Sequence, residues 1–250
     1  MNYNVLTLFP DMILQGMHTS IIGRAMEKGL LTLEAVDIRD FAEPARKRRV
    51  DDYPYGGGAG MVMQAQPVYG AWEDTVARIG RPVRCVYLTP QGRPFCQETA
   101  RELAGEEDLI LLCGHYEGIE ERVIEEIVTD EISIGDYVLT GGELAAMVVM
   151  DAVSRMVPGV LTNDQSGVDE SFSEALLEYP QYTRPEIWHD KPVPPILLSG
   201  HHANVDLWRR QQSILRTRER RPELLKTAVL DKADRKYLAA LQEEDPHLVP

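Results

Sequence analysis

The chain has 250 residues, which is enough for one large domain or two unequal ones with a substantial core. Its formal net charge of -14 excludes a protein that binds nucleic acid through its overall field, so a nucleic-acid role would need a local basic patch. Its three cysteines have neither CxxC spacing nor an even count, so they indicate neither a zinc site nor a disulfide framework.

The N-terminal segment starts an alternation of strands and helices. Residues 3–9 predict a strand, residues 11–28 a helix closed by Gly29, and residues 30–38 a second strand. The opening MNYNVLTLFPDM lacks the basic region and the long apolar core of a signal peptide. No apolar run reaches membrane-spanning length, so we expect a reduced, cytoplasmic protein with no membrane partner.

Residues 39–61 have a composition that no packed element would be expected to use. Four basic residues at 46–49 are followed by Asp51, Asp52 and four glycines. We interpret this segment as a mobile loop that contacts an anionic partner. The alternative is a solvated connection without a binding role.

Strand and helix patterns continue to alternate after this loop. The run DLILLC at 108–113 is almost wholly apolar, as expected for a strand covered on both faces. Cys85 and Cys113 lie in such runs and are predicted to be small buried hydrophobes. The other predicted elements are helices at 67–78, 94–103 and 118–128 and a strand at 83–90. The alternation predicts an α/β domain with a mostly parallel sheet over about the first 160 residues.

Residues 132–143, ISIGDYVLTGGE, combine strand character with closely spaced glycines and lead into a helical sequence. Such glycines are typical where the backbone turns sharply or lies against a ligand, although a plain strand-to-helix turn is the alternative. The strands in VYLTP, LLCGHYEG and SIGDYVLTGGE all end by leaving their apolar pattern. Because ligands sit beyond the carboxyl ends of neighbouring strands in α/β sheets, these three loops are expected to wall one pocket. None carries a P-loop or GxGxxG pattern.

The C-terminal third changes character. Residues 160–174 are polar, small and acidic, which is typical of a flexible linker. Helical segments are predicted near 203–219, 222–229 and 232–243. The segment 207–226 carries seven basic and two acidic residues, which indicates a local surface for a polyanion. The alternative is a solvated helix face whose charges pair with acidic neighbours.

Several long motifs, taken together, resemble the bacterial tRNA (guanine-N1)-methyltransferases of the SPOUT class. They are DDYPYGGGAGM, VYLTPQGRPF, LLCGHYEGIEERV, ISIGDYVLTGGELAAM, SRMVPGVL, YPQYTRPE, PPILLSGHH and RRPELL, and they occur in that family's order over nearly the full chain. The resemblance implies a deep trefoil-knot catalytic domain at 1–160, a linker or lid at 161–175 and a small α-helical tRNA-binding domain at 176–250. It also implies a homodimer that methylates N1 of the guanosine at tRNA position 37.

By the same resemblance, S-adenosylmethionine binds among the knot loops. The positions that match the family's cofactor contacts are Tyr87, Leu88, Pro90, Gly114, Tyr116, Glu117, Ile134, Gly135, Tyr137, Leu139, Gly141 and Gly142. One departure lies beside them, because Ala145 follows Leu144 where the family often has proline. A small apolar contact survives this change, but the backbone loses a constraint.

The resemblance also implies the catalytic residues. Guanine N1 carries a proton and no available lone pair, so methyl transfer to it needs a general base, while charge develops on O6. Arg155 matches the family's catalytic arginine, with an ion pair to Asp151 as the alternative. The family's linker motif EDSF corresponds to Asp169-Glu170-Ser171-Phe172, which places Glu170 at the base position by register. Asp169, beside it, stays an alternative base.

The expected tRNA contacts are Asp51, Ser199, His201, His202, Arg209 and Arg216. The resemblance further implies a dependence on Mg2+, but no pattern in the sequence supplies its site, and the adjacent histidines lack a third ligand for zinc. Two other readings stay open. One is an RNA-binding protein without catalysis, and the other is a SPOUT-class methyltransferase that acts on another RNA position.

Overall fold

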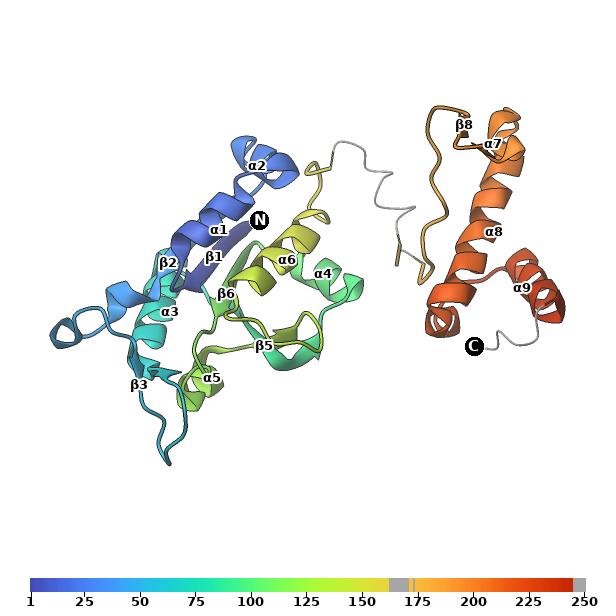
Figure 1. Cartoon of the computed structure of the whole chain (residues 1–250). Coiled ribbons are helices and arrows are strands. Elements are labelled where there is room, and N and C mark those ends of the chain that lie inside the picture. Colours follow the sequence, from blue (N-terminus) through green and yellow to red (C-terminus); the bar gives the residue numbers. More distant parts are fainter. Residues whose placement is uncertain (162–170, 173, 245–250) are drawn as a thin grey trace. The chain divides into compact units, whose positions relative to one another are not determined.

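The computed structural model describes residues 1–161, 171–172 and 174–244. The chain divides into two compact units, Met1–Asp164 and Gln165–Pro250 (Figure 1). Most of the predicted linker at 161–175, including Asp169 and Glu170, lies outside the described residues. Each unit is therefore taken by itself.

A five-stranded sheet forms the centre of the first unit (Figure 1). Its strands run in the order β2-β1-β6-β5-β7, and every neighbouring pair is parallel. They are β1 (Asn2–Thr7), β2 (Thr32–Asp37), β5 (Arg84–Pro94), β6 (Asp108–Cys113) and β7 (Asp130–Ser133). The α/β class and the parallel sheet predicted from the sequence are confirmed.

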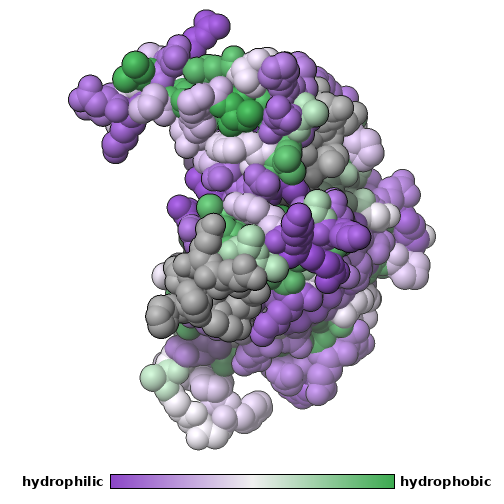
Figure 2. Space-filling view, turned by 90° about the vertical axis from the view of Figure 1, so that its right-hand side faces the viewer, coloured by the Kyte–Doolittle hydropathy of each residue, from purple (hydrophilic) through white to green (hydrophobic). Residues whose placement is uncertain are grey.

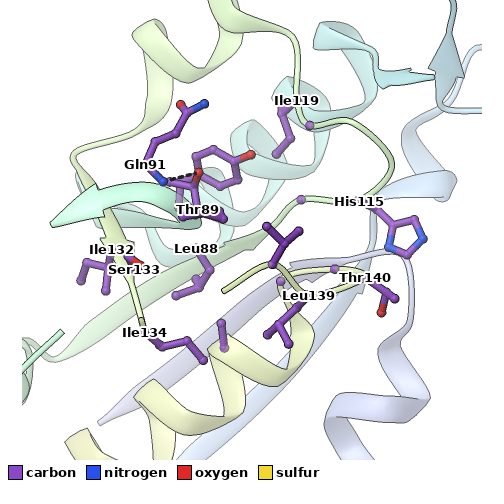
Figure 3. Close-up of a pocket in the computed structure, with 18 of the residues that line it drawn as sticks. Leu88, Thr89, Gln91, His115, Ile119, Ile132, Ser133, Ile134, Leu139 and Thr140 are labelled. Carbon is purple, nitrogen blue, oxygen red and sulfur yellow. Dashed lines mark hydrogen bonds between the residues drawn. The ribbon is translucent and has the colours of Figure 1, made fainter. Parts of the chain in front are cut away.

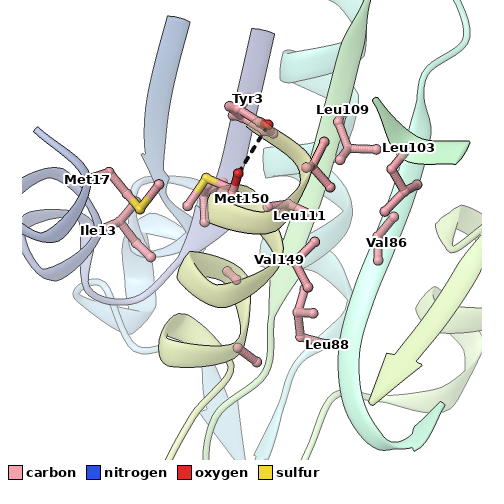
Figure 4. Packing of buried hydrophobic residues seen from close by; sticks show 14 of the residues in the cluster. Tyr3, Ile13, Met17, Val86, Leu88, Leu103, Leu109, Leu111, Val149 and Met150 are labelled. Atoms are coloured by element: carbon pink, nitrogen blue, oxygen red, sulfur yellow. Dashed lines mark hydrogen bonds between the residues drawn. The ribbon is translucent and has the colours of Figure 1, made fainter. Parts of the chain in front are cut away.

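Helices cover both faces of this sheet. In β6, Leu109 and Leu111 belong to the core on one face and Ile110 and Leu112 to the core on the other, and all four are fully buried. Burial of both side-chain rows explains the apolar run in the sequence. Figure 4 shows the first core, where apolar side chains from strands and helices meet. That core is covered by α1 (Pro10–Met17), α2 (Ser20–Glu27), α4 (Gln97–Leu103) and α6 (Glu143–Ser154), and the other by α3 (Ala65–Ile79) and α5 (Glu121–Ile127).

Two element boundaries differ from the sequence prediction. The helix expected over 11–28 is two helices, since the backbone breaks where Ser20 takes a φ of 55°. A Cβ on Gly23 would lie 2.7 Å from the carbonyl of His18, so α2 packs directly on the end of α1. The helix expected at 94–103 begins only at Gln97, because β5 continues to Pro94 and pairs with β7.

The segment 39–61 also differs from its prediction as a loop without packed elements. It contains η1 (Ile38–Phe41), η2 (Pro44–Arg46) and the first strand of a hairpin, β3 (Asp51–Asp52), which pairs with β4 (Val62–Met63). Val50 is 1% exposed and Met63 is 0% exposed, and both belong to the core on the α3 side of the sheet. Two apolar anchors thus attach the polar, glycine-rich sequence between them to the domain.

The second unit is built around one long helix. Arg210 on this helix bonds Asp234, on the last helix of the unit, at 2.8 Å. It also pairs with Glu174 near the start of the unit, so one guanidinium joins three segments. The elements are β8 (Ile187–Trp188), β9 (Lys191–Pro192), α7 (Pro195–Leu198), α8 (His202–Arg220), η4 (Pro222–Lys226) and α9 (Lys232–Glu244). The second helical segment predicted in this unit, 222–229, is a shorter 3-10 helix. In the described part of the chain, no helix is long and apolar enough to cross a membrane.

Candidate active site

A cavity of about 420 Å³ lies at the carboxyl ends of β6 and β7 and beside the irregular part of β5 that follows Leu88. Figure 3 shows side chains from the three loops converging on it. The loops that follow VYL, LLC and EIS therefore wall one pocket, as the sequence predicted. A volume of this size suits a small-molecule ligand or cofactor.

All twelve positions named as cofactor contacts line this cavity. Sequence reasoning did not single out Thr89, Gln91 and His115, which also line it, although they lie inside the motifs VYLTPQGRPF and LLCGHYEG. Thr89 Oγ1 accepts a hydrogen bond of 3.3 Å from the backbone N–H of Gln91 and so shapes the irregular part of β5 between Leu88 and Arg93 (Figure 3). The sequence could have indicated these residues, because the two motifs contain them.

Close packing explains two of the glycines, against backbone at Gly142 and against the side chains of His115 and Glu143 at Gly141. The N–H of Gly142 donates to the carbonyl of Gly114 at 2.9 Å, and a Cβ on Gly142 would lie 2.8 Å from Cα of Cys113. A Cβ on Gly141 would lie 2.7 Å from Nδ1 of His115. The turn before α6 is therefore pressed against the end of β6, where only glycine fits.

Glu143, the first residue of α6, anchors this turn to the end of β1. It is 3% exposed, and its Oε1 accepts a hydrogen bond of 2.8 Å from Oγ1 of Thr7 at the end of β1. The positive end of a helix dipole favours a carboxylate at this place. Cys113 nearby is fully buried, as predicted, and burial, aided by the charge of Glu143, raises the pKa of its thiol.

Aromatic rings border the cavity opening. Tyr116 is 45% exposed and Tyr137 is 54% exposed. The ring of His115 lies 4.9 Å from that of Tyr116 and 5.1 Å from that of Phe9. Tyr87, deeper in the wall, is nearly buried, and this burial raises the pKa of its phenol, so the ring stays neutral. Flat neutral surfaces of this kind suit a ligand with an aromatic ring.

The charged groups on the wall are of one sign. Glu117 and Glu121 line the cavity, and no lysine or arginine is among the described lining residues. Such a wall favours a cation and disfavours phosphate groups. The cavity is therefore suited to a ligand that combines an aromatic ring with positive charge.

Arg155 does not lie at this cavity. It follows the last residue of α6, whose first turn forms the cavity wall. The twelve residues of α6 put roughly 18 Å between the two ends at 1.5 Å per residue. Within one chain, α6 therefore holds Arg155 away from the cavity, and its role as the catalytic arginine stays a prediction. Asp169 and Glu170 lie outside the described residues.

The predicted tRNA contacts are divided between the two units. In the first unit, the carboxylate of Asp51 on β3 lies 3.6 Å from Nε of Arg49. In the second unit, Ser199, His201 and His202 are exposed around the start of α8.

Both basic segments are partly neutralised within their own units. Arg46 bonds Asp52 at 2.7 Å, and Arg48 bonds Asp37 at 2.7 Å. On α8, Arg209 lies 3.4 Å from Asp206 and stacks on Tyr179. Arg216 lies within 3.5 Å of the Glu178 carbonyl, and Arg218 is 4% exposed. The alternative of pairing with acidic neighbours therefore holds for several of these arginines, including Arg210.

Comparison with known proteins decides the family. The model of the family described as tRNA (Guanine-1)-methyltransferase TrmD matches residues 1–227. The chain belongs to this family. Proteins called tRNA (guanine-N(1)-)-methyltransferase are similar to it along almost their whole length. That of Lachnoclostridium phytofermentans is 56% identical, with 97% of both chains covered. That of Lachnospira eligens is 56% identical over 94% of this chain and 99% of its own, and that of Dehalococcoides mccartyi is 51% identical over 98% and 99%.

Because the chain belongs to a methyltransferase family, a methyl donor is implied. The three loops that wall the cavity all lie within the matched residues. Across the described part of the chain, no group of three His, Cys, Asp or Glu side chains gathers that could hold a metal ion.

Proposed function

We propose that this protein transfers a methyl group from S-adenosylmethionine to N1 of the guanosine at tRNA position 37, beside the anticodon. Membership in the tRNA (Guanine-1)-methyltransferase family and the names of relatives above 50% identity support the reaction. A tRNA substrate in turn supports a cytoplasmic location. The observation that carries the proposal within the structure is the cavity at the ends of β5, β6 and β7.

The cavity fits S-adenosylmethionine by its charge and its backbone. This cofactor supplies an electrophilic methyl group on a positively charged sulfonium. Glu117 and Glu121 on a wall without lysine or arginine favour that positive charge. The tightly packed turn at Gly141 and Gly142 leaves room only for backbone, so a ligand there meets N–H and carbonyl groups. The tyrosines at the opening can pack against the adenine.

A deep trefoil knot is part of this proposal. Leu88 and Arg93 both pair with Ile132 of β7, so residues 89–92 bulge out of β5 and return to it. A Cβ on Gly92 would lie 2.3 Å from the backbone nitrogen of Ile132, so the returning chain lies directly on β7. The turn at Gly142 then reaches back to Gly114 at the end of β6. These crossings support a chain that passes through its own loop, which is rare in proteins.

The chemistry requires a base and a stabilising cation at the guanine. Glu170, or Asp169 beside it, is proposed to accept the N1 proton, and the guanidinium of Arg155 to stabilise the charge that develops on O6. The linker carrying both carboxylates is proposed to close over the bound nucleotide. A dependence on Mg2+ belongs to the proposal and is tested by adding a chelator.

A homodimer is also proposed, and the position of Arg155 supports it. Within one chain, α6 separates Arg155 from the cavity by roughly 18 Å. A second subunit that brings its own Arg155 and linker to this cavity would complete the site. Symmetric dimers with isologous interfaces produce two such sites.

The deciding experiment is an in vitro methylation assay with labelled S-adenosylmethionine and tRNA transcripts that carry guanosine or adenosine at position 37. We expect N1-methylguanosine in nucleoside mass spectrometry, formed only with guanosine at that position. A ribose-methylated nucleoside, or methylation elsewhere in the RNA, would assign the protein to another SPOUT-class activity. Binding of tRNA without any modification would indicate an RNA-binding protein.

A further inference from the structure

The β3–β4 hairpin is joined to the wall of the cavity by its backbone. The N–H of Glu117 donates to the carbonyl of Met61 at 3.0 Å, and the N–H of Met63 donates to the carbonyl of Gly118 at 2.9 Å. The N–H of Glu120 completes the set by donating to the carbonyl of Met63 at 3.0 Å. The base of the hairpin and the loop after β6 are thus one hydrogen-bonded unit, and Glu117 and Gly118 line the cavity.

The tip of this hairpin has a backbone that only glycine adopts easily. Gly56, Gly57, Gly58 and Gly60 have φ values of 85°, 80°, 139° and 88°. A Cβ on Gly56 or Gly57 would meet no atom within 4 Å. Glycine is therefore favoured at these two positions by the positive φ and not by lack of space. The tip projects at the bottom of Figure 1, below the label β3, and is the pale projection at the bottom of Figure 2.

Two tyrosines are presented to solvent on this tip. Tyr55 is 101% exposed and Tyr53 is 76% exposed, the largest exposures among the large apolar and aromatic side chains apart from Val138. Tyrosine is amphipathic and loses little entropy when it binds a flat partner, which is why it is enriched at recognition surfaces. The folded domain buries none of Tyr55 and little of Tyr53, so a role outside the fold accounts for these rings better than one within it.

Positive charge lies beside the base of the hairpin. Arg122 bonds Glu120 at 2.7 Å, and the backbone N–H of Glu120 is bonded to the hairpin at Met63. The side chain of Arg122 is 78% exposed. Arg49 lies two residues before the first strand residue of the hairpin, Asp51, and its side chain is 48% exposed. Exposed aromatic rings next to cations are the combination that single-stranded nucleic acid binds.

We propose that Tyr55, assisted by Tyr53, stacks on an unpaired nucleotide base next to the target guanosine. The inference rests on the proposed function. A guanine whose N1 reaches the methyl group of a cofactor in the cavity must leave its stack, and its neighbour then loses a stacking partner. A tyrosine on a hairpin whose base is bonded to the cavity wall replaces that partner. Because every base has a π-face, the contact tolerates different flanking sequences.

Substitutions at Tyr55 separate stacking from other contacts. Tyr55→Phe keeps the ring, Tyr55→Leu keeps apolar volume without the ring, and Tyr55→Ala removes both. We expect the Ala and Leu variants to raise the KM for tRNA by about tenfold, with the Phe variant close to wild type. The affinity for S-adenosylhomocysteine and the melting temperature should not change, because Tyr55 is fully exposed. Glu27→Ala, a change at an exposed residue of α2, is the control.

Abasic RNA identifies the stacked partner. An abasic nucleotide on one side of the target guanosine should weaken wild type about tenfold and add no further loss to Tyr55→Ala. Additive losses at both flanking positions, or an unchanged KM for Tyr55→Ala, would overturn the stacking proposal while leaving the methylation activity in place. If wild type methylates no tRNA, the same RNAs test stacking by equilibrium binding.

A second copy of the chain is the other occupant to distinguish. If Tyr55 served only a contact between subunits, Tyr55→Ala would change the molar mass measured by light scattering without RNA. That result, together with losses that do not depend on the abasic nucleotide, would also overturn the stacking proposal. We expect the same molar mass for wild type and all three Tyr55 variants.

Discussion

Glycine residues shape the cavity because they have no side chain. Gly142 has no room for a methyl group because Cα of Cys113 would lie 2.8 Å from it. Its N–H is committed to Gly114, and the next residue, Glu143, is tied to Thr7. Adding a single methyl group at Gly142 therefore displaces the backbone and not only a side chain.

Gly142→Ala is expected to lower the affinity for S-adenosylhomocysteine at least about tenfold, because the turn must move away from β6. Isothermal titration calorimetry measures the change. Gly16→Ala in α1 is the matched control, since its Cβ would meet only the flexible end of Met147 and alanine favours a helix. Equal affinities for the two variants would show that the turn does not shape the ligand site.

The identity of the general base is a second question of single residues. Glu170→Gln should abolish methyl transfer, whereas Asp169→Asn should keep most of it, because removal of the accepting carboxylate leaves N1 protonated. Single-turnover assays with saturating tRNA measure the step. Binding of S-adenosylhomocysteine serves as the control and should be the same in both variants. The opposite pattern would assign the base to Asp169.

At the scale of elements, ion pairs hold the strands beside the cavity in register. Arg84 at the start of β5 bonds Asp130 at the start of β7 at 2.6 Å, and both side chains are largely buried. Glu102 of α4 bonds the same guanidinium at 2.6 Å. The strands β5 and β7 carry two of the three cavity loops. Ion pairs thus hold these two strands together at the ends opposite the cavity.

Asp130→Asn is expected to lower the free energy of unfolding by about 2 kcal/mol near neutral pH. Arg84 holds the pKa of Asp130 below its ordinary value. A carboxylate of this kind stabilises the fold above its unfolded pKa of about 3.9, and the contribution is lost as the pH falls through the folded-state pKa. The difference between wild type and variant should therefore shrink below about pH 4 in urea titrations.

Asp74→Asn supplies the control for this titration. Asp74 pairs with Arg78 on the surface of α3, where it is 50% exposed. Such a pair contributes little, about 0.5 kcal/mol. A pH-independent difference for Asp130→Asn, or one no larger than that of Asp74→Asn, would contradict a stabilising role for the Arg84–Asp130 pair.

At the scale of the molecule, the position of Arg155 bears on how many chains make one site. The helix α6 starts at the cavity and ends at Arg155, so one chain holds the two apart. A rigid helix cannot shorten, and only another chain or a rearranged C-terminal end of α6 can bring a guanidinium to the cavity.

A mixed dimer distinguishes these possibilities. Gly142→Ala and Arg155→Ala chains, co-expressed with different tags and purified together, should regain about half of wild-type activity, because one of the two sites combines an intact cavity with an intact Arg155. With S-adenosylmethionine held well below the Kd of the Gly142→Ala cavity, each variant alone should have little activity. If the mixed dimer is as inactive as its parents, Arg155 serves the cavity of its own chain.

Local pattern accounts for what the sequence by itself determined. The apolar run of β6 followed from burial on both faces, and the three strand ends that border the cavity followed from parallel pairing. The family motifs marked all twelve predicted lining positions. These features are encoded by neighbouring residues, since periodicity and glycine spacing are properties of short segments.

Contacts between distant residues account for what only the tertiary structure decided. The break between α1 and α2 depends on Gly23 against His18, and the length of β5 depends on pairing with β7. The Thr7–Glu143 bond spans 136 positions of sequence, and Arg210 is neutralised by Asp234. No short window of sequence contains both partners of these long-range bonds, so the folded chain alone fixed the turn at Gly142 and the pairing of Arg210.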